Sequence, residues 1–235
     1  PNFMIRYAPF HMKDLSKKDT SLHYSNLYSI NKTEVIEDGI SAILGLDYKI
    51  YSKDDSKNEQ EKASISFGQV FNLEKNKDLP SSSSLDQRMS DVVGEINYNF
   101  SSIGKIGYKF SLDNNLNDLN YNQVSTNINF GKVSFNLDYL EEQNHVGNEH
   151  YIQPGITLAL SENNKLNFKT KKNYTTDSTE FYDIDYEYTN DCLTAGLLYR
   201  REFYQDGDVA PDDTLWFTIK FLPFGGVQSP KIANP

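Results

Sequence analysis

The residues with the most potential for chemistry are two clusters of acidic and histidine side chains. His145, Glu149 and His150 carry metal-binding groups, but their spacing matches no recognised metal motif. A second, calcium-like cluster lacks the ligand spacing and the terminal Glu of an EF-hand. Its members are Asp206, Gly207, Asp208, Asp212 and Asp213. We therefore predict that both clusters belong to solvated loops and that the chain holds no metal.

Motifs of hydrolytic and nucleotide-dependent catalysis are absent from the sequence. It contains no HExxH, no GxSxG and no phosphate-cradling glycine loop. Its carboxylates instead alternate with Lys and Arg along one side of predicted strands. This pattern indicates a hydrated wall rather than a general acid and base pair. We expect no catalytic residue, no cofactor and no enzymatic activity.

These charges are positioned by stretches in which apolar and polar side chains alternate. About eleven stretches of roughly ten residues follow this pattern between residues 40 and 221. In one of them, Ile106, Tyr108 and Phe110 share one face, whereas Lys105 and Lys109 lie on the other. Side chains of a strand alternate with period two, so the pattern predicts strands and excludes a helix.

Composition narrows the class of protein further. The chain has 235 residues, of which 37% are hydrophobic, and its formal net charge is −10. No window approaches the ~20 consecutive apolar residues of a membrane-spanning helix, but spanning strands need only ~10 alternating residues. The negative charge argues against binding to nucleic acid or to an anionic membrane surface. A single cysteine excludes an internal disulfide framework.

The lengths of the links between the strands predict their topology. Short links alternate with longer loops, as in outer-membrane barrels, whose short turns face the periplasm. We therefore predict an all-β, antiparallel, up-and-down transmembrane barrel over residues 40–225, with about eleven strands. Residues 1–39 are expected to form a loop or a lumen-packed segment, and residues 226–235 a periplasmic tail. The charged stretch 52–62 would be a long periplasmic turn, and residues 75–88 a large external loop.

Charge placement supports two differently solvated faces. The opposite face of the later strands, with Tyr182, Ile184 and Tyr186, is nearly free of charge. That suits lipid, since an Arg or Lys at the bilayer midplane costs roughly 2–4 kcal/mol. A soluble β-sandwich remains an alternative, because its strands also alternate. The residues predicted to face the lumen are Glu95, Lys105, Lys109, Asp138, Lys169, Lys171, Asp183, Asp185, Glu187 and Arg200.

Short motifs follow one another in a characteristic order along nearly the whole chain. They are Asn-Leu-Tyr at 26–28, Gly-Leu-Asp-Tyr at 45–48, Gly-Gln-Val-Phe at 68–71, Ser-Asp-Val-Val-Gly at 90–94, Tyr-Lys-Phe-Ser-Leu-Asp at 108–113, Asp-Cys at 191–192 and Pro-Asp-Asp-Thr-Leu-Trp-Phe at 211–217. In this order and spacing, the chain resembles the C-terminal part of the LptD (OstA) family, most closely its alphaproteobacterial forms.

The resemblance implies a transporter of lipopolysaccharide in the outer membrane. In the family, a periplasmic jelly-roll domain takes lipopolysaccharide from a bridge protein and passes it to a large barrel, which an LptE lipoprotein plugs. The acyl chains leave sideways, and the molecule enters the outer leaflet through a lateral gate between the first and last strands. The family's barrel has more than twice as many strands, so the chain would be its closing part.

Two positions carry family roles over to this sequence. Cys192 matches the second member of a C-terminal cysteine pair, with Asp191 at the place of the first, and implies a disulfide to the periplasmic domain. A free, partly buried thiol is the alternative. The last strand would be one side of the lateral gate, or else an ordinary closing strand, with Pro223 and Gly225 ending its pairing. Its residues are Thr214, Leu215, Phe217, Ile219 and Phe221.

Two further functions stay open from the sequence. A general porin or solute channel would share the alternating strands but should lack the motifs at 191–192 and 211–217. A soluble β-rich binding protein would stay in solution without detergent. In the transporter interpretation, the last strand needs a partner strand that this chain does not contain.

Overall fold

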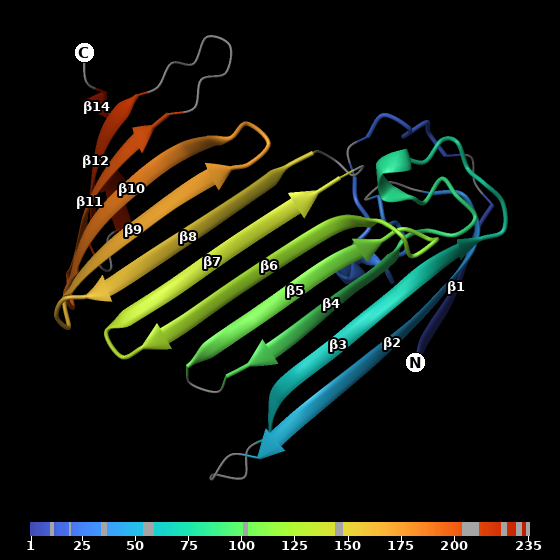
Figure 1. The fold of residues 1–235 in the computed structure, drawn as a ribbon, viewed down its shortest axis with the longest axis horizontal. Helices are drawn as coiled ribbons and strands as arrows, with labels where there is room; N and C mark the ends of the chain where they lie inside the picture. The colour runs from blue at the N-terminus through green and yellow to red at the C-terminus, as the bar shows by residue number, and fades with distance from the viewer. Residues whose placement is uncertain are drawn as a thin grey trace. The chain divides into compact units, whose positions relative to one another are not determined.

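Nearly all regular structure in the chain is β-strand (Figure 1). The computed structural model describes residues 1–9, 12–18, 20–33, 37–53, 59–100, 103–143, 148–203, 212–221, 225–228 and 232–233. Among these residues, no helix is long and apolar enough to cross a membrane. Two 3-10 helices occur, η1 (Tyr24–Asn26) and η2 (Ser81–Ser83). The strands are β1 (Asn2–Ala8), β2 (Gly39–Lys53), β3 (Glu59–Asn72), β4 (Val92–Asn99), β5 (Gly104–Leu112), β6 (Leu119–Phe130), β7 (Val133–Glu142), β8 (His150–Ala159), β9 (Asn164–Asn173), β10 (Ser178–Thr189), β11 (Leu193–Glu202), β12 (Asp213–Phe221), β13 (Gly225–Gln228) and β14 (Ile232–Ala233).

The strands form one up-and-down sheet. From β1 to β13, strands that follow one another in the chain are hydrogen-bonded neighbours, and β14 pairs with β12. Such an order arises when each strand turns back on the previous one, which is the simplest antiparallel arrangement. The predicted all-β, up-and-down architecture is therefore confirmed.

The chain divides into two compact units, which we treat separately. The N-terminal unit comprises Pro1–Ser101, Lys105–Val124 and Leu140–Glu149, and the C-terminal unit comprises Ser102–Gly104, Ser125–Tyr139 and His150–Pro235. In the N-terminal unit, the loops before β2 and after β3 gather at one end of the strands (Figure 1). They cover one sheet face and form a small apolar core there. Its buried residues are Met12, Leu15, Leu22, Leu27, Ile43, Val70, Leu79, Leu85 and Val93.

The C-terminal unit is built from hairpins with regular registers. β10 pairs with β9 and β11 along most of its length, and the one irregularity in these ladders lies between Thr179 and Phe181. β11 pairs with β12 from Leu193 opposite Phe221 to Arg201 opposite Asp213. The predicted alternation therefore places Lys169, Asp183 and Arg200 side by side on one face of β9, β10 and β11.

The structure differs from the expectations near the start of the chain. We expected no strand within residues 1–39, but β1 pairs with the first half of β2, from Asn2 opposite Gly45 to Ala8 opposite Gly39. The alternation in β1 spans only seven residues, which is too short to stand out from sequence alone. Much of the expected turn 52–62 is strand too, because Lys53 pairs with Glu59.

The residues after β12 also differ from a simple tail. β13 and β14 both pair with β12, on the side away from β11. The expectation that Gly225 ends the pairing is wrong, because Gly225 lies opposite Phe221 in this ladder. Pro223 lies outside the described residues.

Candidate functional site

The polar face of the C-terminal unit is held together by ion pairs between neighbouring strands. Arg200 Nε and Nη2 donate to the two carboxylate oxygens of Asp183, at 2.6 and 2.7 Å. The Arg200 guanidinium also lies over the rings of Phe181 and Trp216, 4.6 and 5.9 Å from their centroids. A bidentate pair stacked on aromatic rings has little rotational freedom, so this part of the face is rigid.

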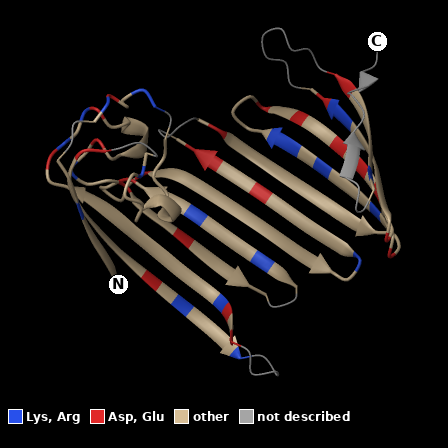
Figure 2. Ribbon diagram, turned by 180° about the vertical axis from the view of Figure 1, so that it is seen from behind, with Lys and Arg blue, Asp and Glu red and all other residues tan. Residues whose placement is uncertain are grey.

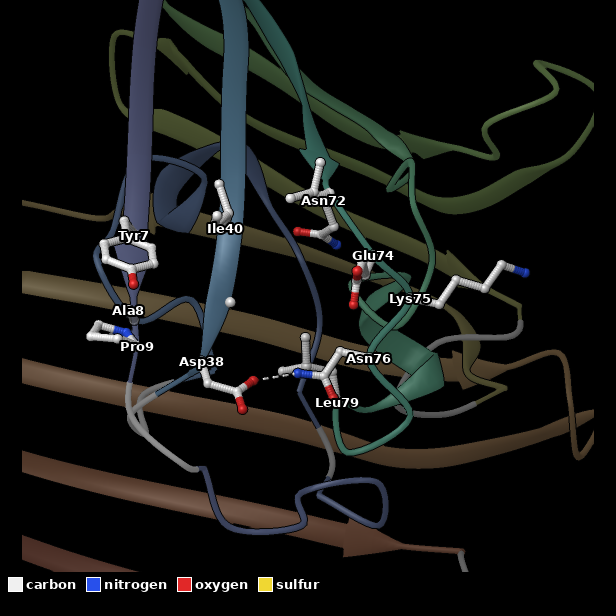
Figure 3. A pocket seen from close by; sticks show the side chains of 12 residues that line it. Tyr7, Ala8, Pro9, Asp38, Ile40, Asn72, Glu74, Lys75, Asn76 and Leu79 are labelled. Atoms are coloured by element: carbon white, nitrogen blue, oxygen red, sulfur yellow. Dashed lines mark hydrogen bonds between the residues drawn. The ribbon is translucent and has the colours of Figure 1, made fainter.

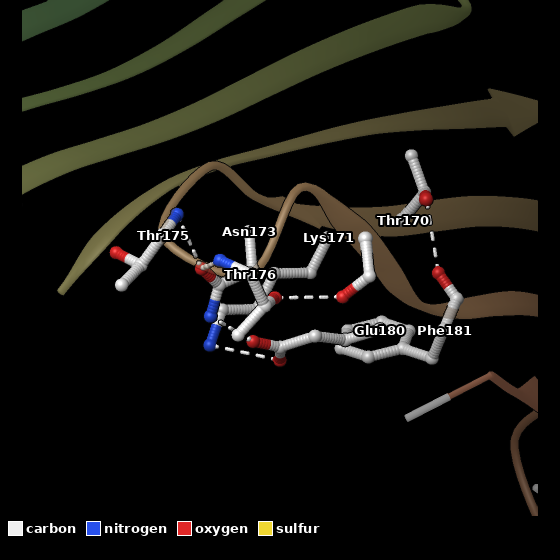
Figure 4. A network of polar contacts seen from close by, with 8 residues as sticks. Thr170, Lys171, Asn173, Thr175, Thr176, Glu180 and Phe181 are labelled. Carbon is white, nitrogen blue, oxygen red and sulfur yellow. Dashed lines mark hydrogen bonds and ion pairs between the residues drawn. The ribbon is translucent and has the colours of Figure 1, made fainter. Parts of the chain in front are cut away.

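A second network lies where β9 turns into β10 (Figure 4). Lys171 Nζ is 2.9 Å from Glu180 Oε2, and the Asn173 amide donates to Glu180 Oε1 at 2.9 Å. The Lys171 ammonium lies 4.3 Å from the centroid of the Tyr151 ring on β8. These contacts tie three successive strands together through one cation and one carboxylate.

Acidic and basic residues recur along the strands of the sheet (Figure 2). Lys165 and Glu187 approach to 3.8 Å, and Asn167 donates to Asp185 at 2.9 Å. Asp183 lies opposite Lys169 across the β9–β10 ladder. In the N-terminal unit, Glu95 lies opposite Lys109, and Lys105 opposite Asn99. Asp138 lies on β7.

The N-terminal unit covers its polar face with its own loop, which we call the covering segment (residues 12–33). Leu22 and Leu27 in this segment are fully buried against Ile43, Val70 and Val93. The contacts of this segment were not predicted, because a loop without periodicity gives no signal of the residues that it covers.

Two glycines make room for the covering segment. Gly45 and Gly68 lie opposite each other on β2 and β3. A Cβ at Gly45 would collide with the hydroxyl of Tyr28, and one at Gly68 would lie 2.5 Å from Leu27 Cδ2. The side chains at 27 and 28 therefore need glycine at both sheet positions.

Tyrosines of the covering segment meet a carboxylate of the sheet. Tyr24 donates a hydrogen bond to Asp47 on β2. Burial raises the pKa of the Tyr24 phenol, and the bond to Asp47 raises it further. Burial likewise raises the pKa of Tyr28. Both phenols therefore remain neutral at physiological pH.

Buried charges hold the end of the covering segment. Arg6, Lys32 and Glu37 are all more than nine-tenths buried, and Arg6 donates to the backbone carbonyl of Glu37. Glu37 Oε1 accepts from the backbone N–H of Thr33 at 2.6 Å. Desolvation lowers the pKa of the Lys32 ammonium, an effect that Glu37 partly offsets. Burying two cations beside one carboxylate costs desolvation free energy, which the hydrogen bonds to Glu37 partly offset.

A pocket of about 510 Å³ lies at the same end of the N-terminal unit (Figure 3). Its lining includes Tyr7, Asp38, Lys75 and Asn76, and the Asn76 amide donates to Asp38 at 2.7 Å. The lining contains two carboxylates, Asp38 and Glu74, and Asp38 is engaged by this amide, so we assign no chemistry to this pocket.

The predicted gate strand, β12, has two unlike faces. Leu215, Phe217 and Phe221 are exposed, whereas Thr214 on the other face is buried. Ile219 is partly buried and lies opposite Ala195 of β11. The opposite edge of β12 pairs with β13 and β14, so both edges of this strand are occupied.

Cys192 is exposed and unpaired in this chain. It belongs to the tight turn between β10 and β11, where its backbone N–H donates to Asn190 Oδ1 at 2.9 Å. An exposed thiol on a rigid turn is accessible to a partner from outside the unit.

The described residues contain no group of three or more His, Cys, Asp or Glu side chains placed to hold a metal ion. His150 instead forms a 3.1 Å hydrogen bond with the hydroxyl of Tyr139. His145 and most of the acidic cluster at 206–213 lie outside the described part of the chain.

The chain matches one protein family, and its fold is similar to that of a solved porin structure. The family described as LptD, LPS transport system D, matches residues 1–168. No curated protein sequence matches the chain. Among solved structures, a triple mutant of the Rhodopseudomonas blastica porin is 11% identical, with a TM-score of 0.47. That similarity covers 84% of this chain and 90% of the porin chain.

Proposed function

The chain belongs to the LptD family of the lipopolysaccharide transport system, and from this premise we propose that it forms one wall of a lipopolysaccharide-transporting barrel. The family is one of transport and assembly rather than of enzymes, and it points to the outer membrane. The finer proposal is that lipopolysaccharide crosses along the polar face of the sheet and leaves through a lateral gate formed by β12.

The two-faced sheet is the observation that carries this proposal. In the C-terminal unit, large apolar side chains are exposed on one face, while Asp183, Arg200 and Lys171 form ion pairs on the other. Exposed apolar residues suit lipid, and a charged, hydrogen-bonded face suits a hydrated lumen that sugars traverse. The exposed residues are Ile156, Phe168, Tyr182, Ile184, Tyr186, Leu197, Tyr199, Leu215, Phe217 and Phe221.

We infer the orientation of the sheet from the ends of β11 and β12. Leu193, which follows Cys192, lies opposite Phe221 at the end of β12. We place this end in the periplasm, together with the C-terminus. There Cys192 would form a disulfide to the jelly-roll domain that receives lipopolysaccharide from the bridge protein, and the oxidising compartment would preserve it. An LptE-like lipoprotein would plug the lumen.

Site-specific photo-crosslinking in the full-length protein tests the transport path. A crosslinker at Asp185 on the polar face should capture lipopolysaccharide only while the molecule is supplied from the inner membrane. The neighbouring position Ile184, on the apolar face, is the matched control, because it should capture resident membrane lipid whether or not supply continues. Transport along this face is refuted if Asp185 and Lys109 capture no lipopolysaccharide in a folded, heat-modifiable barrel.

A further inference from the structure

The chain's own C-terminal residues cover the outer edge of β12. Ile219 lies opposite Val227 and Thr218 opposite Gln228, in a four-residue antiparallel ladder with β13. At the other end of β12, Thr214 lies opposite Ala233 and β14 continues the pairing. This edge is therefore paired near one end by β13 and near the other by β14.

The two edges of β12 are held unequally. β11 pairs with β12 without a break from Arg201 to Leu193, whereas β13 and β14 are short and separate. β13 also places Gly225 and Gly226 opposite Phe221 and Lys220, where they add no side-chain contact across the ladder. Because each backbone bond adds only ~0.5–1.5 kcal/mol net, the ladder with β13 and β14 is the one that opens first.

An uncovered edge would be costly for a strand in a membrane. Its N–H and C=O groups would lack partners in lipid, and in water they would template pairing with other chains. A short strand from the same chain removes both problems at low cost, because its local concentration is high.

We propose that β13 and β14 act together as an exchangeable partner, which pairs with the outer edge of β12 and leaves when this edge pairs with another strand. The inference rests on the proposed function, in which β12 is one side of the lateral gate. It adds that the gate strand carries its own substitute partner. When the gate opens or closes, one set of backbone hydrogen bonds at the outer edge of β12 is then replaced by another. The N–H and C=O groups of this edge keep partners throughout.

A disulfide across the ladder tests both parts of the proposal. In the full-length protein, Thr218→Cys is combined with Gln228→Cys, because opposed Cα atoms in antiparallel strands are ~4.5–5.5 Å apart, which suits a disulfide. The control combines Thr218→Cys with Ala233→Cys, whose partner Thr214 lies four residues or ~13 Å away along β12. Cys192 is retained in every variant, and mass spectrometry identifies the linked peptides.

The expected result is that the 218–228 disulfide forms at least ~10-fold faster than the control disulfide in folded barrels. The linked protein should then deliver at least ~10-fold less lipopolysaccharide to the cell surface and recover on reduction, while the parent chain treated alike does not change. Equal linking rates would overturn the pairing. Normal delivery by the linked protein would overturn the exchange and make the segment a fixed cap.

The parent chain separates this inference from the proposed function. If the parent captures no lipopolysaccharide at Asp185, the transport proposal fails and exchange at a gate fails with it. The linking rates still decide whether the segment pairs with β12. If the parent captures lipopolysaccharide and the linked protein still delivers it, only the exchange fails.

Discussion

The ion pair between Asp183 and Arg200 should stabilise the polar face of the C-terminal unit. Its removal should therefore lower the free energy of unfolding by a measurable amount. Replacing Arg200 by Leu would leave the carboxylate of Asp183, whose side chain is only 10% exposed, without its bidentate partner. Truncating one partner of a fully buried pair costs about 3–5 kcal/mol, whereas exposed pairs contribute about 0.2–1 kcal/mol. Because the Arg200 side chain is 31% exposed, we expect a loss of about 2–3 kcal/mol.

A double-mutant cycle isolates the pair from other effects of the substitution. The single variants are Arg200→Leu and Asp183→Asn, and the double variant removes both charges together. We expect a coupling energy of about 1–2 kcal/mol, since removing both partners leaves neither charge of this pair without the other. Lys165 and Glu187 provide the matched control, because their pair is longer, at 3.8 Å, and more exposed. Its coupling should be below about 0.5 kcal/mol.

Urea unfolding of barrels refolded in lipid provides the assay. Trp216 is the chain's only tryptophan and lies 5.9 Å from the Arg200 guanidinium, so its fluorescence reports on this part of the wall. Midpoints should shift without a change of slope, since the pair alters stability and not the surface exposed on unfolding. Equal coupling for the two pairs would refute the reasoning, because it would mean that water screens both to the same extent.

Three further predictions concern other parts of the chain. Gly68→Ala should expose the covering segment to protease, because its Cβ would lie 2.5 Å from Leu27 Cδ2 and 2.7 Å from a backbone oxygen; Gly196→Ala, whose nearest neighbour is 3.8 Å away, should not. Burial lowers the pKa of Lys32 in the folded state, so the unfolded chain binds more protons between that pKa and the ordinary value of 10.5. The free energy of unfolding should therefore rise with pH through this window, and Lys32→Met should flatten the rise in pH-dependent urea titrations; an unchanged slope would contradict the burial argument. Cys192 should resist maleimide in the oxidised full-length protein and react after reduction, and labelling without reductant would show a free thiol.

The strands, and the strand face on which each side chain lies, were predictable from the sequence because both are local properties. Side chains alternate between the two faces of a strand whatever the tertiary arrangement. Glu95 and Lys109 could therefore each be assigned to the polar face before their pairing across β4 and β5 was known. β1 was missed for a related reason, since seven residues hold too few repeats. The pairing of β13 with β12 was missed because Gly225 was given its usual meaning of a strand end.

The individual contacts of the covering segment could not be predicted, because they join residues that are distant in the chain. Leu27 touches Gly68 only once β2 and β3 are in register and the loop has folded back over them. Neither the loop nor the glycine has a pattern of its own. The pairing of Asp183 with Arg200, in contrast, is a local consequence of two predicted neighbouring strands whose charged residues lie on the same face.

One signal for the covering segment does exist in the sequence, in the exceptions to the alternation. Ile43, Val70 and Val93 are apolar residues on the polar face, and all three are essentially buried. Ile43 lies opposite Val70, and Val93 lies opposite Gly68, so they form one patch over β2, β3 and β4. An apolar side chain that stays in contact with water contributes no hydrophobic free energy. It stabilises the fold only where other apolar groups cover it. A run of such exceptions on neighbouring strands therefore marks where the sheet is covered by its own loops. The charged positions on the same face mark where the sheet is not covered.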